Sequence, residues 1–515
     1  MPQSESWPYE EAQRILDRVG DPKAEIILQT GFGPSGFPHI GTFGEVTRTT
    51  FIRRALGDLG ATNVRLFVFS DDMDALRKVP LNFPDSLGEH LGRALNEIPD
   101  PFNCCDSFSG HMNGKLNQML GRFGFDYEFR SSVIQYKSGL FNNGLRAMLE
   151  NVEKIRGIIL PTLGAEKRDA WSPFLPICSK CRRMSTTRVT AYLKDKGAVA
   201  YVCDGQLGQV KGCGNEAEAL VTDGQCKVGW KADWALRWFV YGVTYEMYGK
   251  DLIESADLSG KIVKALGGKP PVNFFFELFL DEAGAKISKS VGKGVTVDTW
   301  LKYAPVESLA LFMLRNPRRA KKLFLGVIPQ QVDELLGEID HHYKEEEKDG
   351  RRSTYRFLNP DPPAHTPYVA NLSYGTLTSL AGTLGSPEPE IVVQYVKKGF
   401  GWPAGDDVPV HKMIEGAVLF DREVLAPDRK PYKPVDEKER AVVQKLHDAL
   451  AQPRTGEEIQ NDIYAIGKDL GLGSGAVFKT LYQVIIGQER GPRLGLFIPV
   501  LGQDKVREIL KRALD

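Results

Sequence analysis

Residues 25–76 decide the fold: EIILQT (25–30) runs into GFGPSGFPHIGT (31–42), then FGEVTRTTFIRRAL (43–56), and later RLFVFSDDMDAL (65–76). The apolar first and last segments predict strands, and the apolar spacing of 43–56 predicts a helix. Strand, glycine-rich turn, helix and strand form a βαβ unit, which predicts a parallel sheet. Ligands of such sheets bind at the carboxyl ends of the strands, where the turn and Asp71–Asp72 are expected to meet.

Composition fits a large globular protein. The chain has 515 residues, 42% hydrophobic and 26% charged, which predicts two to four domains. No apolar run approaches the roughly 20 residues of a membrane span, and the start, MPQSESWPYEEAQRIL, lacks a secretory signal, so we expect a cytoplasmic protein. Basic and acidic residues balance at 66 each, which does not exclude a nucleic-acid partner, because local patches set phosphate affinity.

The rest of the chain changes character twice. Residues 171–230 hold four cysteines, many glycines and short polar strands, as in a small insertion. NFFFELFL (273–280) predicts another strand, which leads into DEAGAKISKSVGKG. After residue 300 the spacing becomes helical, with proline-rich linker candidates at 359–367 and 426–439. From residue 370 onwards we expect an α-helical domain.

The turn at 31–42 contains a formal GxGxxG, which alone suggests a dinucleotide fold. In that fold the helix opens at the glycines and an acidic residue follows about 20 positions later. Here Pro38, His39 and Gly41 come first, and Asp71 lies about 35 residues after Gly36, so the spacing argues against NAD. PSGFPHIGT instead resembles the HIGH sequence of class I aminoacyl-tRNA synthetases and their nucleotidyltransferase relatives. A glycine-rich turn with a core histidine is the structural alternative for this motif alone.

The second motif, KISKS at 286–290, resembles the KMSKS loop of the same enzymes, with Ile in place of Met. The resemblance implies a mobile clamp whose lysines neutralise ATP phosphates as pyrophosphate leaves, with Lys289 the most critical residue. A solvated basic loop is the alternative, but two such motifs in the right order, each after an apolar strand, argue against it. The implied catalytic residues are His39, Thr42, Lys286 and Lys289. The implied ATP-binding residues are Pro34, Ser35, Gly36, His39, Gly41, Thr42, Lys286, Ser288, Lys289 and Ser290, with Mg²⁺ accompanying the ATP.

The resemblance narrows to class I lysyl-tRNA synthetases and spans nearly the whole chain. It rests on QTGFGPSGFPHIGTFGEV, SDDMDALRKVP, WKADWALRW (230–238), YEMYGKDLIESA (245–256), ELFLDEAGAKISKSVGKG and FKTLYQVIIGQERGPRLGLFIPVLG (478–502). Thr42 stands where class I enzymes often carry His or Asn, and Leu252 where many relatives read GKDH; the second departure puts in doubt any role for a histidine there.

This resemblance implies an α/β fold: a Rossmann-like parallel-sheet catalytic domain (1–300) with a small zinc-ribbon-like insertion (171–229), a helical stem-contact region (301–358) and an all-α anticodon-binding domain (359–515). It implies a ligase that activates L-lysine with ATP and loads it onto tRNA(Lys), as a monomer. The rivals are a glutamyl-type synthetase, which a basic residue in the amino acid pocket would favour, and a synthetase-like tRNA-binding protein without catalysis.

Lysine needs an anionic partner for its ε-ammonium group, preferably a partly buried carboxylate. Asp233, between Trp230 and Trp234, is the first choice, although a helix-capping role is equally compatible with its position. A neighbouring ring could pack the aliphatic stem of the substrate. Asp71 and Asp72 could bind the α-amino group or cap the next helix. The expected lysine-binding residues are Gly31, Gly33, Asp71, Trp230 and Asp233.

Cysteine spacing predicts a structural zinc site. Cys178-x2-Cys181 is followed by Cys203 and by Cys213 in a Gly-Cys-Gly turn, and four thiolates in two arms suit tetrahedral zinc. The nine-residue gap in the second arm is wider than usual, so four unlinked thiols are the alternative. Cys104, Cys105 and Cys226 are expected to be ordinary buried thiols.

Two basic regions are candidates for tRNA contact. The cluster RNPRRAKK (315–322) follows the clamp loop, and such a cluster can neutralise the phosphates of a tRNA stem, although a solvated helix face is the alternative. RNA bases are usually read unstacked on aromatic rings or arginines, for which Phe478 and Tyr482 are candidates, although core packing explains both rings equally well. The expected tRNA-binding residues are Arg318, Arg319, Lys321, Arg490 and Arg493.

Overall fold

The structure is a computed structural model that describes residues 7–81, 83–287, 295–344, 353–385, 387–403, 405, 407–428, 432–434 and 436–515. The chain forms two compact units. The first comprises residues 1–297 and 313–323, and the second comprises 298–312 and 324–515. The predicted subdivision of the second unit at residue 358 stays a prediction.

The first unit is built on a five-stranded sheet in the order β12-β11-β1-β2-β3. Its strands are β1 (Ile26–Phe32), β2 (Val64–Ser70), β3 (Glu128–Ser131), β11 (Tyr245–Gly249) and β12 (Val272–Phe276). Every neighbouring pair is parallel, so all carboxyl ends lie at one edge. The predicted βαβ unit and Rossmann-like core are thereby confirmed.

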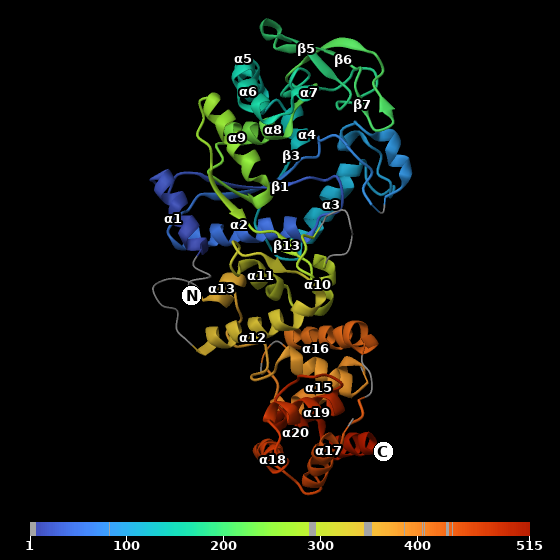
Figure 1. The fold of residues 1–515 in the computed structure, drawn as a ribbon. Helices are drawn as coiled ribbons and strands as arrows, with labels where there is room; N and C mark the ends of the chain where they lie inside the picture. The colour runs from blue at the N-terminus through green and yellow to red at the C-terminus, as the bar shows by residue number, and fades with distance from the viewer. Residues whose placement is uncertain are drawn as a thin grey trace. The chain divides into compact units, whose positions relative to one another are not determined.

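Helices cover both faces of this sheet. Alternate side chains of a strand point to opposite faces, and Ile27, Phe67 and Phe69 belong to one buried cluster with Trp234 and Trp238. These tryptophans lie on α8 (Trp230–Tyr241), which packs with α9 (Ile253–Ala265), whereas α2 (Ile40–Asp58) packs against β1 and β2 beside α1 (Trp7–Val19). Figure 1 shows α2 and α9 on opposite sides of β1.

The strand expected over 273–280 is interrupted. β12 ends at Phe276, and the backbone N–H of Glu277 then donates to the carbonyl of Pro317 at 2.9 Å. A second short strand, β13 (Phe279–Leu280), pairs with β14 (Lys321–Lys322) outside the main sheet. Residues 277–280 therefore contact the segment 313–323 and do not extend β12. The apolar composition of 273–280 did not predict this break in the strand.

The insertion contains short antiparallel strands. β4 (Phe174–Pro176) pairs with β10 (Cys226–Val228) at the base of the insertion, which returns the chain to α8. Between them lie β5 (Arg188–Leu193), β6 (Ala198–Val202) and β9 (Glu216–Leu220) in one sheet, and the pair β7 (Gln206–Leu207) and β8 (Val210–Lys211). The remaining helices of this unit are α3 (Phe108–Gly121), α4 (Ser132–Lys137), α5 (Asn142–Glu150), α6 (Val152–Ile159) and α7 (Ala165–Arg168).

The second unit is helical, as predicted for the C-terminal region. Its helices are α10 (Val297–Tyr303), α11 (Val306–Leu314), α12 (Ile328–Lys344), α13 (Thr354–Leu358), α14 (Tyr374–Thr383), α15 (Pro389–Phe400), α16 (Val408–Phe420), α17 (Glu437–Ala449), α18 (Gly456–Asp469), α19 (Ser474–Ile486), α20 (Leu494–Leu501) and α21 (Gln503–Leu514), the first two of which reach into residues of the other unit. Within the described ranges, no helix is long and apolar enough to cross a membrane.

Candidate active site and metal centres

His39 is the N-cap of α2, directly after the glycine-rich turn that leaves β1. Its Nδ1 atom accepts the backbone N–H groups of Gly41 at 3.0 Å and Thr42 at 3.3 Å. Because Nδ1 is an acceptor, the neutral imidazole carries its proton on Nε2. The cap therefore makes Nε2 a hydrogen-bond donor beside the positive end of the helix dipole, which suits a phosphate.

The glycines on either side of His39 in the sequence differ in whether packing requires them. A Cβ atom on Gly41 would lie 2.8 Å from Nδ1 and Cε1 of His39, so a side chain there would push the ring out of its cap. At Gly31, Gly33 and Gly36, in contrast, no described heavy atom lies within 4 Å of such a Cβ. Packing within the described protein does not require glycine at these three positions, and they leave open space for a ligand at the carboxyl edge of the sheet.

The start of the clamp loop forms a small hairpin. Leu280 bridges Lys286, and the N–H of Asp281 donates to the carbonyl of Ala285 at 2.8 Å. The Lys286 ammonium lies 3.8 Å from Asp251, and both side chains are more than half exposed, so this pairing is weak. Ser288, Lys289 and Ser290 lie outside the described residues. Of the remaining predicted phosphate ligands, Thr42 is buried and Ser35 is exposed.

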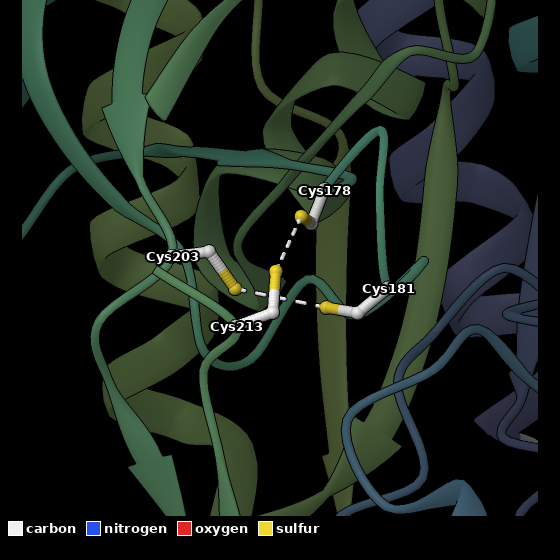
Figure 2. Close-up of side chains that lie close together, drawn as sticks. All are labelled: Cys178, Cys181, Cys203 and Cys213. Atoms are coloured by element: carbon white, nitrogen blue, oxygen red, sulfur yellow. Dashed lines mark hydrogen bonds between the residues drawn. The ribbon is translucent and has the colours of Figure 1, made fainter. Parts of the chain in front are cut away.

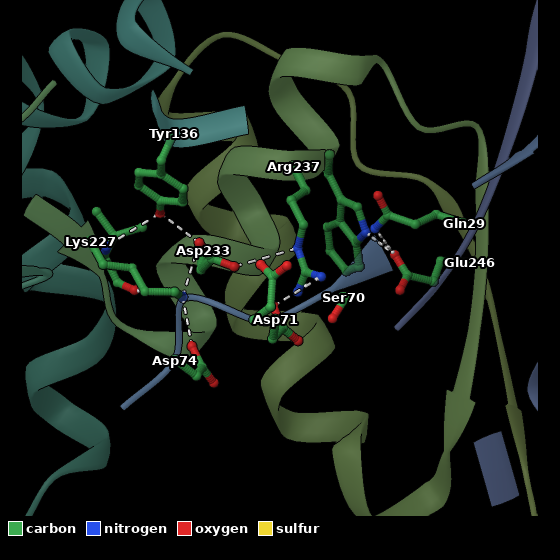
Figure 3. Close-up of polar contacts among 12 residues, drawn as sticks. Gln29, Ser70, Asp71, Asp74, Tyr136, Lys227, Asp233, Arg237 and Glu246 are labelled. Atoms are coloured by element: carbon green, nitrogen blue, oxygen red, sulfur yellow. Dashed lines mark hydrogen bonds and ion pairs between the residues drawn. The ribbon is translucent and has the colours of Figure 1, made fainter. Parts of the chain in front are cut away.

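A buried ionic cluster forms around Asp71, which directly follows β2 (Figure 3). Nη1 of Arg237 lies 3.4 Å from Oδ1 of Asp71, and Nε of the same guanidinium lies 3.5 Å from Oδ2 of Asp233. The Lys227 ammonium, from β10, lies 3.3 Å from Oδ1 of Asp233 and 2.8 Å from Oδ1 of Asp74. The sequence did not predict that Lys227 and Arg237 belong to this cluster, because Lys227 lies in the insertion and Arg237 among apolar helix residues.

Asp233 is completely enclosed. Its side chain is 0% exposed, and it accepts a 2.6 Å hydrogen bond from the hydroxyl of Tyr136 in addition to its two ion pairs. In the part of the chain that the structure describes, its side-chain partners are therefore two cations and a phenol. Trp230 stacks on Trp234 at 4.9 Å between ring centroids and lies 5.8 Å from the Arg237 guanidinium. Asp71, by comparison, follows β2 directly, and its backbone N–H donates to the carbonyl of Phe32.

Asp72 has a structural role. It accepts hydrogen bonds from Ser131 Oγ at 2.5 Å, from Asn113 Nδ2 at 3.1 Å and from the backbone N–H of Val133 at 2.9 Å, in the first turn of α4. Of the two neighbouring carboxylates, the structure thus separates a helix-capping Asp72 from an Asp71 that faces the ionic cluster. The sequence left both roles open for both residues.

The four cysteines of the insertion converge (Figure 2). Their sulfur atoms all lie within 4.8 Å of one another, with Cys178–Cys213 at 3.6 Å and Cys181–Cys203 at 3.7 Å. Tetrahedral zinc with Zn–S bonds of about 2.3 Å needs sulfur separations of about 3.8 Å, so the donor set fits the ion. Burial opposes ionisation, but backbone N–H groups of Cys181 and Lys180 lower the pKa of Cys178 to about 6.

A second group of side chains that could hold a metal was not predicted from the sequence. Cys104 and Cys105 are exposed, so the expectation that they are buried thiols is wrong; Cys226 is buried as expected. Cys104 Sγ lies 3.1 Å from His111 Nδ1 and 3.4 Å from Asp100 Oδ2, and the four ligand atoms of Asp100, Cys104, Cys105 and His111 all lie within 4.8 Å of one another. The signal was present as Asp-x3-Cys-Cys-x5-His within residues 100–111, but scattered ligand types conceal such a group.

Comparisons with known proteins show the family of this chain. The family model for class I tRNA synthetases (K) matches residues 5–361, and the anticodon binding domain model matches 410–514. The chain belongs to the class I lysyl-tRNA synthetase family. Curated lysine--tRNA ligases are similar: that of Rickettsia bellii (strain OSU 85-389) is 38% identical, covering 99% of this chain and 98% of the relative, and that of Rickettsia felis is 39% identical, covering 99% and 96%.

Among solved structures, a glutamate tRNA ligase from Elizabethkingia meningosepticum in complex with its amino acid is 11% identical, covering 95% of this chain and 99% of that one. Its TM-score of 0.40 is too low to support an argument.

The predicted tRNA contacts lie in both units. Arg318 is exposed, but its guanidinium stacks on the rings of Phe274 at 4.4 Å and Phe275 at 4.6 Å, so it also anchors the segment 313–323 to β12. Lys321 Nζ donates to the carbonyl of Arg315, whereas Arg319 is exposed. In the second unit, Arg490 and Arg493 are exposed at the turn before α20.

An aromatic row lies on the same part of the second unit. Tyr464 of α18 is 52% exposed and lies edge-on to Phe478 of α19, with 5.4 Å between ring centroids. Tyr482 is 6.1 Å from Phe478, half-buried, and its hydroxyl donates to Pro492. Phe478 and Tyr482 were candidates from the sequence, whereas Tyr464 was missed because it belongs to another helix.

Proposed function

We propose that this chain is a lysine--tRNA ligase, which converts ATP, L-lysine and tRNA(Lys) to lysyl-tRNA, AMP and pyrophosphate through a lysyl-adenylate. The observation that carries the proposal is that His39, which caps α2 through Nδ1, and Asp71 follow two neighbouring parallel strands at one sheet edge, in a chain of the lysyl family. As in class I enzymes generally, transfer to the terminal ribose would use its 2′-hydroxyl. The family supports a cytoplasmic protein, and we expect a monomer.

The residues that bind ATP come from both motifs. The turn Pro34–Gly36, Gly41 and Thr42 line the approach to His39, whose Nε2 donates to a phosphate oxygen on which negative charge grows. Lys286, Ser288, Lys289 and Ser290 close on the leaving pyrophosphate, with Lys289 supplying the main positive charge. Mg²⁺ bound to the ATP phosphates would neutralise charge on the leaving group.

The amino acid lies over Gly31 and Gly33, whose missing side chains leave room for it. Asp71 forms an ion pair with an ammonium group of the substrate. Asp233 contributes through its ion pair with Arg237, which also pairs with Asp71. Trp230 packs against the aliphatic stem of the lysine. Basic residues near this site are the feature expected of a glutamyl-type enzyme. Lys227 and Arg237 are both ion-paired here, however, and among the described residues of this cluster three carboxylates face two cations, an acidic excess that favours lysine.

The four sulfur atoms of Cys178, Cys181, Cys203 and Cys213 would hold a structural zinc, which would hold the two arms of the insertion together. The mixed group of Asp100, Cys104, Cys105 and His111 offers oxygen, sulfur and nitrogen donors that zinc also accepts. Neither set lies among the proposed ATP-binding residues, so both are assigned to stability.

Amino-acid-dependent ATP–pyrophosphate exchange tests the proposal. The full-length protein is assayed with ATP, Mg²⁺ and each of the twenty amino acids, and exchange is expected with lysine. Exchange with glutamate would replace the proposal by the glutamyl-type rival, and exchange with no amino acid would favour a tRNA-binding protein without catalysis. Charging of a tRNA(Lys) transcript with lysine then tests the second step.

A further inference from the structure

The ionic cluster at the proposed amino acid site contains more carboxylates than cations. Among the residues that the structure describes, Asp71, Asp74 and Asp233 contact two cations, Lys227 and Arg237. Asp233, Lys227 and Arg237 are 2% exposed or less, and Asp71 is 6% exposed, so solvent cannot balance the excess negative charge at low cost. Within this cluster, charge neutrality requires either one proton on a carboxylate or one further cation.

Asp71 is the carboxylate in this cluster that takes up the proton or pairs with the further cation. Asp233 is held by both cations and by Tyr136, and Asp74 is 2.8 Å from Lys227 with a side chain 37% exposed to water. Asp71 has a single ion pair, at 3.4 Å, and among the described residues its Oδ1 atom receives no hydrogen bond. A buried carboxylate oxygen without a donor costs free energy, which either a proton or an ammonium group would relieve.

Accordingly, we infer that lysine binding is linked to proton release: an ammonium group of the substrate replaces a proton on Asp71, and Arg237 is the positioning residue that holds this carboxylate. The inference rests on the proposed function and specifies how that site selects a cation. The proton leaves to solvent, the carboxylate gains an ion pair with the ammonium, and the cluster stays close to neutral in both states.

The surroundings of Asp71 give the expected direction of the pH dependence. Burial raises the pKa of Asp71 to about 8, Arg237 and Lys227 oppose the rise, and Asp74 and Asp233 add to it. From β11, Glu246 also faces Arg237, and burial raises its pKa as well. Asp71 is therefore mostly protonated at pH 7 and mostly ionised above pH 9, and the affinity for lysine should rise across this interval.

Calorimetric titration of the full-length protein with L-lysine tests the inference. At pH 7, titrations in buffers of different ionisation enthalpy should show most of one proton released per lysine bound, with the release falling as the pH rises above the pKa of Asp71. Lysine binding with no dependence on the buffer at pH 7 overturns the inference and leaves the proposed function intact. Failure to bind lysine, with or without ATP, overturns both.

Substitutions separate linkage from a purely structural role. D71N should abolish proton release and weaken lysine binding roughly 10- to 100-fold, the loss of a charge-assisted contact. R237M should shift the pH profile of lysine affinity to higher pH, R237K should restore it, and D74N should shift it to lower pH, because Asp74 raises the pKa of Asp71. Opposite shifts for R237M and D74N are not expected from general destabilisation; identical profiles in all variants would refute the linkage.

The chain offers a matched control in Arg48, which is as buried as Arg237 but donates to the carbonyl of Met313 and stacks on Phe276 at 4.6 Å. R48M should lower the melting temperature without shifting the pH profile. If R237M does not fold, D71N and the half-exposed D74N still decide the outcome. Titration with 6-aminohexanoate, which keeps only the ε-ammonium, and with norleucine, which keeps only the α-amino group, identifies which ammonium displaces the proton.

Discussion

The Nδ1 atom of His39 accepts the backbone N–H of Gly41 at 3.0 Å, so one side chain both caps α2 and fixes which ring nitrogen can donate. A helix cap is worth ~1 kcal/mol, whereas a hydrogen bond made to charge that develops in the transition state is worth about 100-fold or more in rate. The two contributions can therefore be separated by substitution.

His39→Asn is expected to fold with near-normal stability, because asparagine is a good N-cap, while ATP–pyrophosphate exchange falls about 100-fold or more through loss of the Nε2 donor. His39→Ala should lose the same activity and also ~1 kcal/mol of stability. Thermal melting and exchange rates measured on both variants check this. Normal exchange in His39→Asn would show that the ring serves only as a cap.

Lys289→Ala is expected to reduce lysine-dependent ATP–pyrophosphate exchange by about two orders of magnitude or more, because it removes the main positive charge assigned to the leaving phosphates. The loss should appear in kcat rather than in the KM for lysine. Lys293→Ala, in the same loop, serves as the control and should stay within a few-fold of the unsubstituted protein. Near-normal exchange in Lys289→Ala would refute the clamp.

Metal analysis of the purified protein should find about two zinc ions per chain, one for each group of converging ligands. Cys213→Ser should lose one ion and lower the melting temperature, because the ion holds two arms of the insertion together. His111→Ala should lose the other. Cys226→Ala removes a buried thiol that belongs to neither group and should keep both ions. Protein that binds no zinc after refolding with the metal would contradict both assignments.

Arg490 and Arg493 should matter only when tRNA is present. Alanine at both positions is expected to raise the KM for tRNA(Lys) and to lower the dependence of binding on salt by about one counterion per arginine, with ATP–pyrophosphate exchange unchanged. Arg512→Ala is the control, because Arg512 is exposed but pairs with Glu508 on its own helix. Equal effects of all three arginines would point to nonspecific attraction.

Tyr464→Ala tests the stacking surface in the same way. The ring is half exposed beside Phe478, and loss of a base–aromatic stack costs ~1–3 kcal/mol of RNA binding. We expect weaker charging of tRNA(Lys) and normal adenylate formation. Tyr395, which lies on a different helix, α15, provides a comparison, since Tyr395→Ala should leave charging unchanged.

The sequence by itself determined the βαβ start, the parallel sheet and the helical C-terminal region, because periodicity and glycine-rich turns are local properties of the chain. It also predicted the helix over 43–56, whereas α2 begins earlier, at Ile40, and includes Gly41. The four insertion cysteines were correctly grouped, because their spacing carries the pattern.

Only the tertiary structure decided which charges meet. Lys227 comes from the insertion, Asp74 follows β2, and Arg237 lies one helical turn after Asp233, so no linear pattern announces the cluster that they form. The same holds for Asp71 and Asp72, which are neighbours in sequence but point to an ionic cluster and to a helix cap. Burial and pairing of charges depend on contacts between distant segments, and those contacts exist only after the chain has folded.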